Sequence, residues 1–391
     1  MSDRHTADFL ILGAGVMGAS LAFHLARRKP GRILVIDKAA VGQGGSGRSS
    51  ALVRMHYSFP PEVRLAVKSL EIFQNWREIV GFPGDFRRTG FVRIVPEGEI
   101  DRLRANVAMQ CDNGARTRVV GAQELKEIEP DWNVDDVAAA AYEPDSGYGD
   151  GAGVATDFLS AARDMGVEYR SQTRVGALRV EGGRVRGVVT ESGEGIEAPV
   201  VVSAVGPWSR PLFRAVGVDL PVDTEYHQVA ILKNPPRMRP GGCACIDSLL
   251  QLYYRSEGRD MTLVGGFYGP RGVDADEFPQ AASDESIAEM AVGIARRIPA
   301  LEEGGVVRAI TGVYDMSPDA RPLLGPVPGL EGLHVMAGFS GMGFKISPAV
   351  GLAMSELLLD GRGTTVDIGD FRPARFAEGR SIKARFEYQD D

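Results

Sequence analysis

The sequence is poor in the residues that mark disulfide-rich and metal-binding proteins. Its 391 residues include three cysteines, an odd number without the spacing of a disulfide framework, which fits a reducing compartment. Cys243 and Cys245 are separated by one alanine but lack the second pair of ligands that a structural zinc site needs. We therefore expect free thiols and no bound metal.

Clustered positive charge and long apolar segments are also missing. The formal net charge is −8 and no basic stretch stands out, which argues against a nucleic-acid partner. No segment approaches the ~20 apolar residues of a membrane span, and the N-terminal residues lack the positive start and apolar stretch of a signal peptide. These absences predict a cytoplasmic protein without a membrane span.

The length and the hydrophobic pattern of the chain predict two domains of mixed α and β structure. A single core stops growing at roughly 250–300 residues, and this chain is longer. Apolar and turn-forming residues predict strands at 8–12, 32–36, 90–95, 137–142, 226–232, 250–255, 261–268, 306–313 and 333–337, with three more within 173–202. Helices are expected at 15–29, 61–80, 97–110, 121–128, 152–165, 283–298 and from about 347 to 360, the last starting at Ser347-Pro348.

The first chemical motif is the glycine-rich turn at residues 13–18, Gly-Ala-Gly-Val-Met-Gly. It follows an apolar strand and precedes a helix, the setting in which glycines let a backbone approach a pyrophosphate. Asp37 ends the next strand, about 20 positions further on, where a ribose-binding acid is expected. The motif predicts dinucleotide binding; the alternative is a glycine turn without a ligand.

A second glycine- and serine-rich stretch, residues 42–50, follows Asp37 and bears on which dinucleotide binds. NAD-binding proteins usually continue into another helix at this point. A loop that offers many backbone N–H groups and hydroxyls suits a longer cofactor such as FAD. A disordered surface loop is the alternative.

The chain resembles the D-amino-acid oxidase superfamily of FAD enzymes, nearest to sarcosine oxidase, glycine oxidase and the β subunits of sarcosine and proline dehydrogenases. The matching blocks are ILGAGVMGAS with VIDK, GGSGRSSALVRMHYS, VVSAVGPWS and MSPDARPLLGPVPGLEGLHVMAGFSGMGFKISPAVG, which together extend over essentially the whole chain. The resemblance implies an α/β fold with a Rossmann-type FAD-binding domain and an inserted α+β substrate domain built on a mixed antiparallel sheet. The expected boundaries are 1–85, 148–217 and 316–391 for the first domain, and 86–147 and 218–315 for the second.

The last of these blocks reads as a cap over the cofactor. The glycines at 338–343 allow close backbone approach to a flat ring, and Lys345 with the start of a helix supplies positive character near a reduced flavin. An ordinary strand–turn–helix connection is the alternative. The residues expected to contact FAD are Gly13, Gly15, Val16, Met17, Gly18, Asp37, Lys38, Gly45, Ser46, Arg48, Ser49, Ser50, Val175, Ala204, Gly206, Trp208, Gly338, Gly341, Met342, Gly343, Phe344 and Lys345.

Arg54 and Lys345 occupy the positions at which the resemblance implies a clamp for a substrate carboxylate. A guanidinium binds a carboxylate through two hydrogen bonds and an ammonium adds charge. A surface ion pair for Arg54, and contact with the flavin alone for Lys345, are the alternatives. Weaker candidates for substrate contact are Tyr253, Tyr254, His56, Tyr57 and His227. Because side chains alternate along a strand, only one of the two adjacent tyrosines points inward.

The resemblance implies that a hydride passes from the C–N bond of a small amino acid or N-methylated amino acid to flavin N5. Gly312 stands two positions before Tyr314, where covalent-flavin members carry a cysteine, so we expect non-covalent FAD. Residues 263–270 lack the lysine that oxidases of the family use, which leaves oxygen, an electron carrier or a partner subunit open as acceptor. The rival functions are a 2-hydroxyacid oxidoreductase, a nicotinamide dehydrogenase and a non-catalytic flavin-binding assembly subunit.

Overall fold

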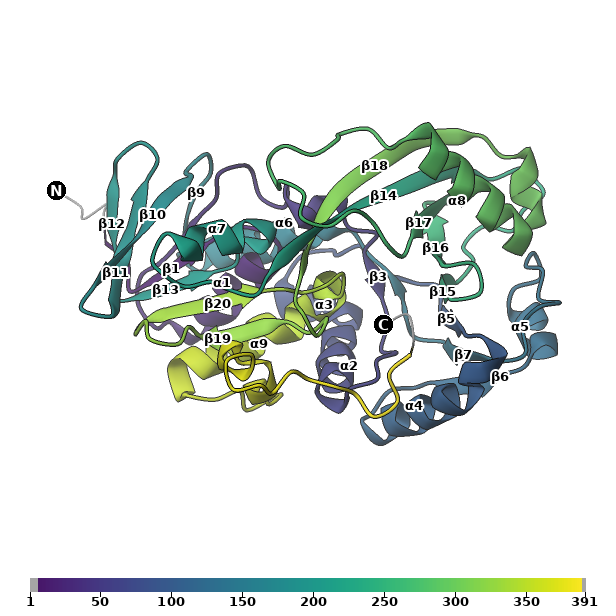
Figure 1. Ribbon diagram of the computed structural model, residues 1–391, viewed down its shortest axis with the longest axis horizontal. Helices are drawn as coiled ribbons and strands as arrows, with labels where there is room; N and C mark the ends of the chain where they lie inside the picture. The colour runs from purple at the N-terminus through teal and green to yellow at the C-terminus, as the bar shows by residue number, and fades with distance from the viewer. Residues whose placement is uncertain (1–5, 389–391) are drawn as a thin grey trace.

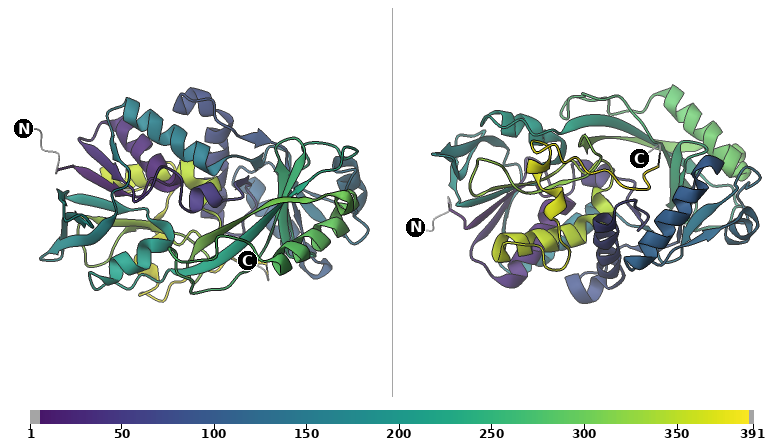
Figure 2. Two further views of the ribbon diagram at one scale, coloured as in Figure 1. Left: turned by 90° about the horizontal axis from the view of Figure 1, so that it is seen from above. Right: turned by 60° about the horizontal axis from the view of Figure 1, so that its bottom comes forward.

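The computed structural model describes residues 6–388 and divides them between two lobes, each built on its own large sheet (Figure 1). Figure 2 shows from two further sides that the lobes lie next to each other along the longest axis of the molecule. The first lobe holds the N-terminal β-α-β unit, and the second holds a larger sheet with helices on its outer side. The expected α/β fold is confirmed.

The sheet of the first lobe has six strands in the order β19-β20-β13-β1-β2-β9. Five strands are parallel to their neighbours and only β19 pairs antiparallel, with β20. Their bounds are β1 Phe9–Leu12, β2 Ile33–Ile36, β9 Glu168–Arg170, β13 Val200–Ser203, β19 Leu323–Pro326 and β20 Leu333–Ala337. The strands come from both ends of the chain, so residues far apart in sequence meet at the carboxyl edge of this sheet.

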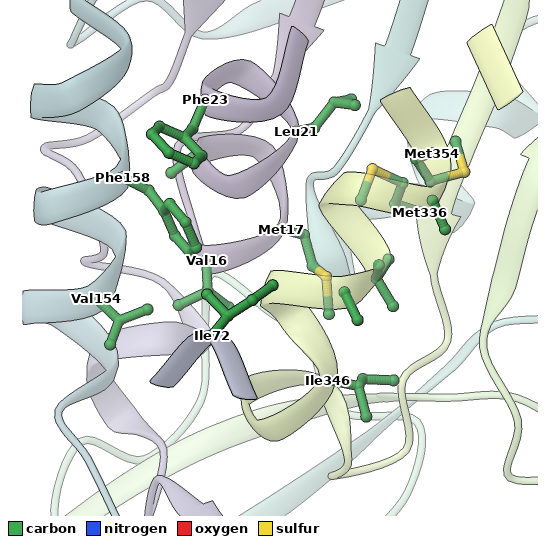
Figure 3. Close-up of a cluster of buried hydrophobic side chains, with 14 of the residues drawn as sticks. Val16, Met17, Leu21, Phe23, Ile72, Val154, Phe158, Met336, Ile346 and Met354 are labelled. Atoms are coloured by element: carbon green, nitrogen blue, oxygen red, sulfur yellow. The ribbon is translucent and has the colours of Figure 1, made fainter. Parts of the chain in front are cut away.

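Two layers cover this sheet because its strands are apolar on both sides. One face packs on α1 (Val16–Arg28), α6 (Gly151–Asp164) and α9 (Gly343–Asp360). Figure 3 shows side chains of these three helices, including Met17, Phe158 and Ile346, meeting in one apolar cluster. The other face packs on a three-stranded antiparallel sheet of β10 (Val175–Glu181), β11 (Arg184–Thr190) and β12 (Gly195–Glu197).

The second lobe is built on eight strands in the order β18-β14-β17-β16-β15-β5-β7-β6. All neighbouring pairs are antiparallel except β15 with β5, so the sheet is mixed, as expected. The strands are β5 Phe91–Ile94, β6 Arg118–Val120, β7 Ala140–Glu143, β14 Asp223–Lys233, β15 Ala244–Asp247, β16 Leu252–Glu257, β17 Met261–Gly266 and β18 Val306–Met316. Helices α4 (Ile100–Asp112), α5 (Ala122–Ile128) and α8 (Asp284–Arg297) belong to this lobe.

Short elements join the two lobes. A small sheet contains β3 (Leu52–Val53), β8 (Gly147–Tyr148) and β4 (Arg87–Arg88), and helices α2 (Pro60–Gln74) and α3 (Trp76–Val80) lie beside it. Helix α7 (Ser209–Arg214) follows β13. The eight-stranded sheet takes strands from both segments that the sequence assigns to the substrate domain; the domain boundaries themselves stay a prediction.

The structure corrects three details of the expected elements. The helix expected from Ser347 begins at Gly343, and Pro348 lies inside it. Pro348 has no N–H for the carbonyl of Phe344, and the hydroxyl of Ser347 donates to that carbonyl instead, at 2.9 Å. The helix expected over 61–80 is broken at Asn75, and residues 173–202 contain four strands rather than three. No helix of residues 6–388 is long and apolar enough to cross a membrane.

Candidate active site

A cavity of about 1090 Å³ brings together the glycine-rich turns from the two ends of the chain. Gly13 and Gly15 line it from the start of α1, and Gly341 and Gly343 line it from the start of α9. The 42–50 loop, the end of β13, part of β18 and the loop after β17 complete its wall. The cavity is therefore lined by several segments that are distant from one another in sequence.

The turn before α1 has the geometry that a pyrophosphate requires. Gly13 has φ +101°, and a side chain at Gly18 would place its first carbon 1.9 Å from the carbonyl oxygen of Gly13. The Asp37 carboxylate accepts hydrogen bonds from the N–H groups of Ala14 at 2.6 Å and Ala39 at 2.8 Å, which fixes the turn beside the acid. Burial raises the pKa of Asp37, and these two bonds oppose that shift.

Positive and aromatic side chains gather at the same end of the cavity. Lys38 lies 3.5 Å from the centre of the Trp208 ring, and both residues contact Asp276 of the loop after β17. The hydroxyl of Ser46 accepts the N–H of Val16 at 3.0 Å, so the 42–50 loop is attached to the start of α1. Arg48 donates to the carbonyl of Thr311 in β18, at 2.8 Å.

The turn at residues 338–342 closes the other end of the cavity. Gly338 has φ +70° and Gly341 has φ +81°, a backbone conformation that glycine adopts without strain. The carboxylate of Asp315 accepts the N–H of Gly338 at 2.7 Å, and burial raises the pKa of Asp315 to about 6. A side chain at Gly341 would meet the ring of Tyr314 at 3.0 Å, so Tyr314 packs directly on the turn.

Arg54 and Lys345 are brought together next to this turn. The side chain of Lys345 is buried and donates to the carbonyl of Gly341 at 3.0 Å. Burial, followed by the positive charge of Arg54, lowers the pKa of Lys345 well below its ordinary value. The Arg54 guanidinium lies 4.3 Å from the centre of the Tyr57 ring, donates to the carbonyl of His56, and has a buried Nε without an acceptor among residues 6–388.

The weaker candidates separate into two groups. Tyr253 lies on the same side of the sheet as Tyr314, near enough for each phenol to affect the pKa of the other. Tyr254 points to the opposite side, where its ring packs edge-on against Trp132 with centroids 5.3 Å apart. The structure therefore does not bring Tyr254 to the cavity.

The two histidines are both buried but have different neighbours. His227 pairs with Glu225 at 3.0 Å and stacks on Tyr314 with centroids 3.9 Å apart. His56 bonds to the hydroxyl of Tyr388 at 2.8 Å. His227 is thus linked to the cap of the cavity through Tyr314, whereas His56 is linked to the C-terminal segment.

Most of the residues expected to contact the cofactor line the cavity. Those that line it are Gly13, Gly15, Val16, Met17, Asp37, Lys38, Gly45, Ser46, Arg48, Ser49, Val175, Ala204, Gly206, Trp208, Gly341, Gly343 and Phe344. The remaining five, Gly18, Ser50, Gly338, Met342 and Lys345, are not part of the lining. Gly18 and Gly338 instead shape the two turns, and Ser50 accepts from Arg255 at 2.5 Å.

The sequence reasoning did not select several residues of the cavity wall. Tyr314 and Asp315 contribute from β18, Arg174 from the position just before β10, and Asp276 from the loop after β17. In the sequence, Tyr314 is only the reference point for Gly312. Its position next to the matching block that begins at Met316 is the signal that could have identified it as a site residue. Asp276 has no local signal, because its partners Lys38 and Arg174 are more than one hundred positions away in the chain. Within residues 6–388 no group of His, Cys, Asp or Glu is placed to hold a metal ion.

The shape and donors of the cavity fit FAD. Both glycine-rich turns line it, and at Gly13 and Gly15 no side chain covers the backbone. Basic side chains line one end. Gly312 faces Arg48, and a side chain at Gly312 would place its first carbon 3.3 Å from the Cβ of Arg48. Gly312 itself is not part of the cavity lining, and non-covalent binding stays a prediction from the sequence.

Comparison with known proteins gives matches over most of the chain. Residues 8–357 match the family model described as FAD dependent oxidoreductase, DAO. The chain is 25% identical over 382 residues to sarcosine oxidase subunit beta of Rhodobacter capsulatus, covering 96% of this chain and 90% of that protein. It is 24% identical to the mitochondrial sarcosine dehydrogenase of Mus musculus, covering 91% of this chain but only 40% of that protein.

A solved structure agrees in its overall shape. L-proline dehydrogenase from P. horikoshii superposes with a TM-score of 0.88 at 26% sequence identity, and the match covers 97% of this chain and 100% of that one. The family match takes in both glycine-rich turns and the β-strands between them. The chain belongs to the DAO family of FAD-dependent oxidoreductases.

Proposed function

We propose that this protein oxidises the C–N bond of a small amino acid or N-methylated amino acid, with non-covalent FAD as the hydride acceptor. The observation that carries the proposal is the proximity of half-buried Arg54 and buried Lys345 beside the turn at residues 338–342. Neither side chain forms an ion pair within residues 6–388, although the charge of Arg54 acts on Lys345. A buried ammonium beside a half-buried guanidinium, neither with an acidic partner, favours a bound anion.

The charge of Arg54 acts on the pKa of Glu143, although the two residues do not form an ion pair. Its Oε2 accepts from the N–H of Met55 at 2.8 Å and from the hydroxyl of Ser146 at 2.6 Å, and burial raises its pKa to about 7. Among residues 6–388, Arg54 therefore has no strongly ionised acid as an ion-pair partner. A substrate carboxylate would pair with Arg54 and restore the ordinary preference of Lys345 for its charged form.

The protein groups provide binding, orientation and exclusion of water. Arg54 and Lys345 would hold the carboxylate and so fix the neighbouring carbon and nitrogen relative to the turn at 338–342. Their positive charge also favours the neutral amine, which is the form that releases a hydride. FAD, when bound, supplies the two-electron acceptor for that hydride. The resulting imine is expected to hydrolyse to a free amine and a carbonyl compound.

The names of the relatives support a substrate that carries both an amine and a carboxylate. They include sarcosine dehydrogenase, dimethylglycine dehydrogenase, 4-methylaminobutanoate oxidase and L-proline dehydrogenase. The chain spans about 40% of the length of the sarcosine dehydrogenases it matches, so the activity of those whole proteins is not transferred. One relative is named as a subunit of sarcosine oxidase. The electron acceptors to test are therefore a partner subunit, an electron carrier and oxygen.

The three cysteines are free in the structure, with Cys111 exposed and the other two buried. We propose a cytoplasmic location, which free thiols favour because they persist in a reducing compartment. Fractionation of cells that express the protein under its natural promoter would test this placement.

The function is tested by anaerobic bleaching of the purified flavoprotein. The panel pairs each amino acid or N-methyl amino acid with its neutral amide and with its 2-hydroxyacid counterpart. Bleaching by the amino acid but not by the hydroxyacid supports amine oxidation, whereas the reverse identifies a hydroxyacid oxidoreductase. A flavin that no compound bleaches would overturn the enzymatic proposal.

The carboxylate clamp is tested by Arg54→Ala. Losing a charged, bidentate partner is expected to lower kcat/KM for the best carboxylate substrate by about a hundredfold, with flavin content unchanged. Arg104→Ala, which removes an exposed arginine of α4, serves as the matched control and should leave kcat/KM unaltered. If Arg54→Ala keeps full activity on the acid, the clamp is assigned to the wrong residue.

A further inference from the structure

The C-terminal segment after residue 375 crosses from the first lobe to the second and is attached along its length. The N–H of Ile382 donates to Asp319 at 2.9 Å, and Glu387 pairs with Arg321 at 3.0 Å. Asn106 of α4 donates to the carbonyl of Phe386 at 2.8 Å. In Figure 1 this segment runs past the lower end of α2 toward the second lobe, so it reaches the region between the lobes.

Tyr388 lies at the inner end of this segment. It is 4% exposed and packs in a small apolar cluster of the second lobe that includes Val95 and Leu103. The guanidinium of Arg93, in β5, lies 4.8 Å from the centre of its ring. A tyrosine so deeply inserted from a segment without regular structure is held by the second lobe rather than by its own segment.

The hydroxyl of Tyr388 meets a residue of the loop that carries the clamp. It lies 2.8 Å from Nε2 of His56, and the two rings are stacked with centroids 5.8 Å apart. His56 is 2% exposed, and burial, Arg93 and Arg54 together lower its pKa well below the ordinary value. The imidazole is therefore neutral, and its orientation depends on hydrogen bonds rather than on charge.

His56 in turn contacts Arg54 through its backbone. The Nη1 of Arg54 donates to the carbonyl oxygen of His56, which leaves the buried Nε of the same guanidinium available. A guanidinium binds a carboxylate well only when its plane is held in the correct direction. The contacts thus run from Tyr388 to the His56 ring, and from the His56 carbonyl to Arg54.

We propose that Tyr388 is a positioning residue of the carboxylate site: its hydroxyl holds the His56 ring, and the His56 backbone in turn holds the guanidinium of Arg54. The C-terminal segment of the FAD-binding lobe thereby contributes to substrate recognition in a loop that lies more than 300 positions earlier in the chain. The inference rests on the proposed function, because it assigns a role within the same clamp.

The test compares Tyr388→Phe with Glu387→Gln in the full-length flavoprotein. Tyr388→Phe keeps the ring and removes only the hydroxyl, whereas Glu387→Gln weakens the neighbouring anchor to Arg321 and leaves His56 untouched. Acetate is titrated into the oxidised protein and its binding is followed by the change in flavin absorption. We expect about a three- to tenfold rise in the acetate Kd for Tyr388→Phe and no rise for Glu387→Gln.

Kinetics provide a second readout that a purely structural role would not move. For Tyr388→Phe, KM should rise for the carboxylate substrate with little change in kcat, and KM for the neutral amide should stay the same. In a His56→Phe background the additional change Tyr388→Phe should have no further effect, since the two residues act in series. Thermal unfolding of each variant shows whether the fold is kept.

Three outcomes would overturn the inference: an unchanged acetate Kd, an equal shift in both variants, or an equal KM change for acid and amide. The failure of the proposed function gives a different pattern. If Arg54→Ala also leaves acetate binding unchanged, the clamp itself is wrong. If Arg54→Ala weakens acetate binding and Tyr388→Phe does not, only the positioning role of Tyr388 is wrong.

Discussion

The two ends of the cavity are built from different parts of the polypeptide. At the nucleotide end the backbone forms the surface: Gly13 and Gly15 leave it uncovered, and Asp37 and Ser46 hold its N–H groups in place. Beside the other end lie the side chains proposed to bind substrate, above all half-buried Arg54 and buried Lys345, which do not themselves line the cavity. A site made of backbone needs particular residues at fixed short spacings, whereas a site made of side chains can draw them from anywhere in the chain.

The two ends also differ in how their charges are balanced. Near the nucleotide end, Lys38 and Arg174 both pair with Asp276 at the protein surface. At the substrate end, Lys345 is buried and Arg54 is half-buried, and neither has an ion-pair partner among the described residues. The first arrangement is already neutralised, and the second gains most from a negatively charged ligand.

The largest effect is expected from a change at the nucleotide end, Gly18→Ala. The added carbon would lie 1.9 Å from the Gly13 carbonyl oxygen, so the turn and α1 must move apart. We expect loss of most bound FAD and a clear fall in the melting temperature, measured by flavin absorbance per protein and by thermal unfolding. Gly98→Ala is the control, because a side chain there meets no atom within 4 Å. Full FAD content in Gly18→Ala would show that backbone contact at this turn does not decide cofactor binding.

This contrast explains which parts of the protein the sequence predicts. The turn at residues 13–18 and Asp37 were identified from local spacing and the turn at 338–343 from the family resemblance, and all three line or shape the cavity. The choice between Tyr253 and Tyr254 was not possible, because strand alternation says that one faces inward but not which one. Which tyrosine faces inward is decided by the pairing of β16 with β15 and β17 in the sheet.

Other features depend on contacts that no local pattern encodes. Pro348 normally indicates the first turn of a helix, but the Ser347 hydroxyl satisfies the carbonyl that Pro348 leaves free, so α9 starts four residues earlier. His56 was a weak candidate because a lone histidine gives no partner in the sequence. Its contact with Tyr388 joins the two ends of the chain, and only the folded structure brings them together.

An intermediate effect is expected from Glu143→Gln at the substrate end, and it depends on pH. Burial raises the pKa of Glu143 from 4.5 to about 7, so the folded protein binds a proton more tightly than the unfolded chain does. The stability from this neutral form is complete below pH 4.5 and is lost as pH rises to about 7. The glutamine stays neutral, so the variant should gain up to about 3 kcal/mol in the free energy of unfolding, relative to the native protein, between pH 4.5 and 8.

Denaturant unfolding at pH 5 and pH 8 measures this difference. Glu78→Gln, which changes an exposed carboxylate on α3, is the matched control and should run parallel to the native protein at both pH values. A constant difference between Glu143→Gln and the native protein across this range would show that Glu143 is ionised in the folded state. Arg54 would then have an acidic partner of its own, and the contrast in charge balance between the two ends would disappear.

The smallest effect is expected from Asp276→Asn, at the outer edge of the nucleotide end. The carboxylate of Asp276 contacts Lys38, Arg174 and the indole N–H of Trp208, which links the loop after β17 in the second lobe to three residues of the first. Partial burial raises the pKa of Asp276, but the hydrogen bonds from Lys38 and Arg174 outweigh it and lower the value to about 2. The group is therefore a carboxylate throughout the neutral range, and the asparagine removes its charge while keeping its shape.

Because these ion pairs are partly exposed, each contributes little to stability, and the change should act mainly on how long FAD is retained. We expect FAD to dissociate about three- to tenfold faster from Asp276→Asn, followed by flavin fluorescence after dilution. Glu277→Gln removes the same charge from the same loop without touching Lys38 or Arg174, so its rate should equal that of the native protein. Equal rates in all three proteins would mean that the loop does not cover the nucleotide end. Backbone contacts alone would then retain the cofactor, which makes the difference between the two ends of the cavity sharper still.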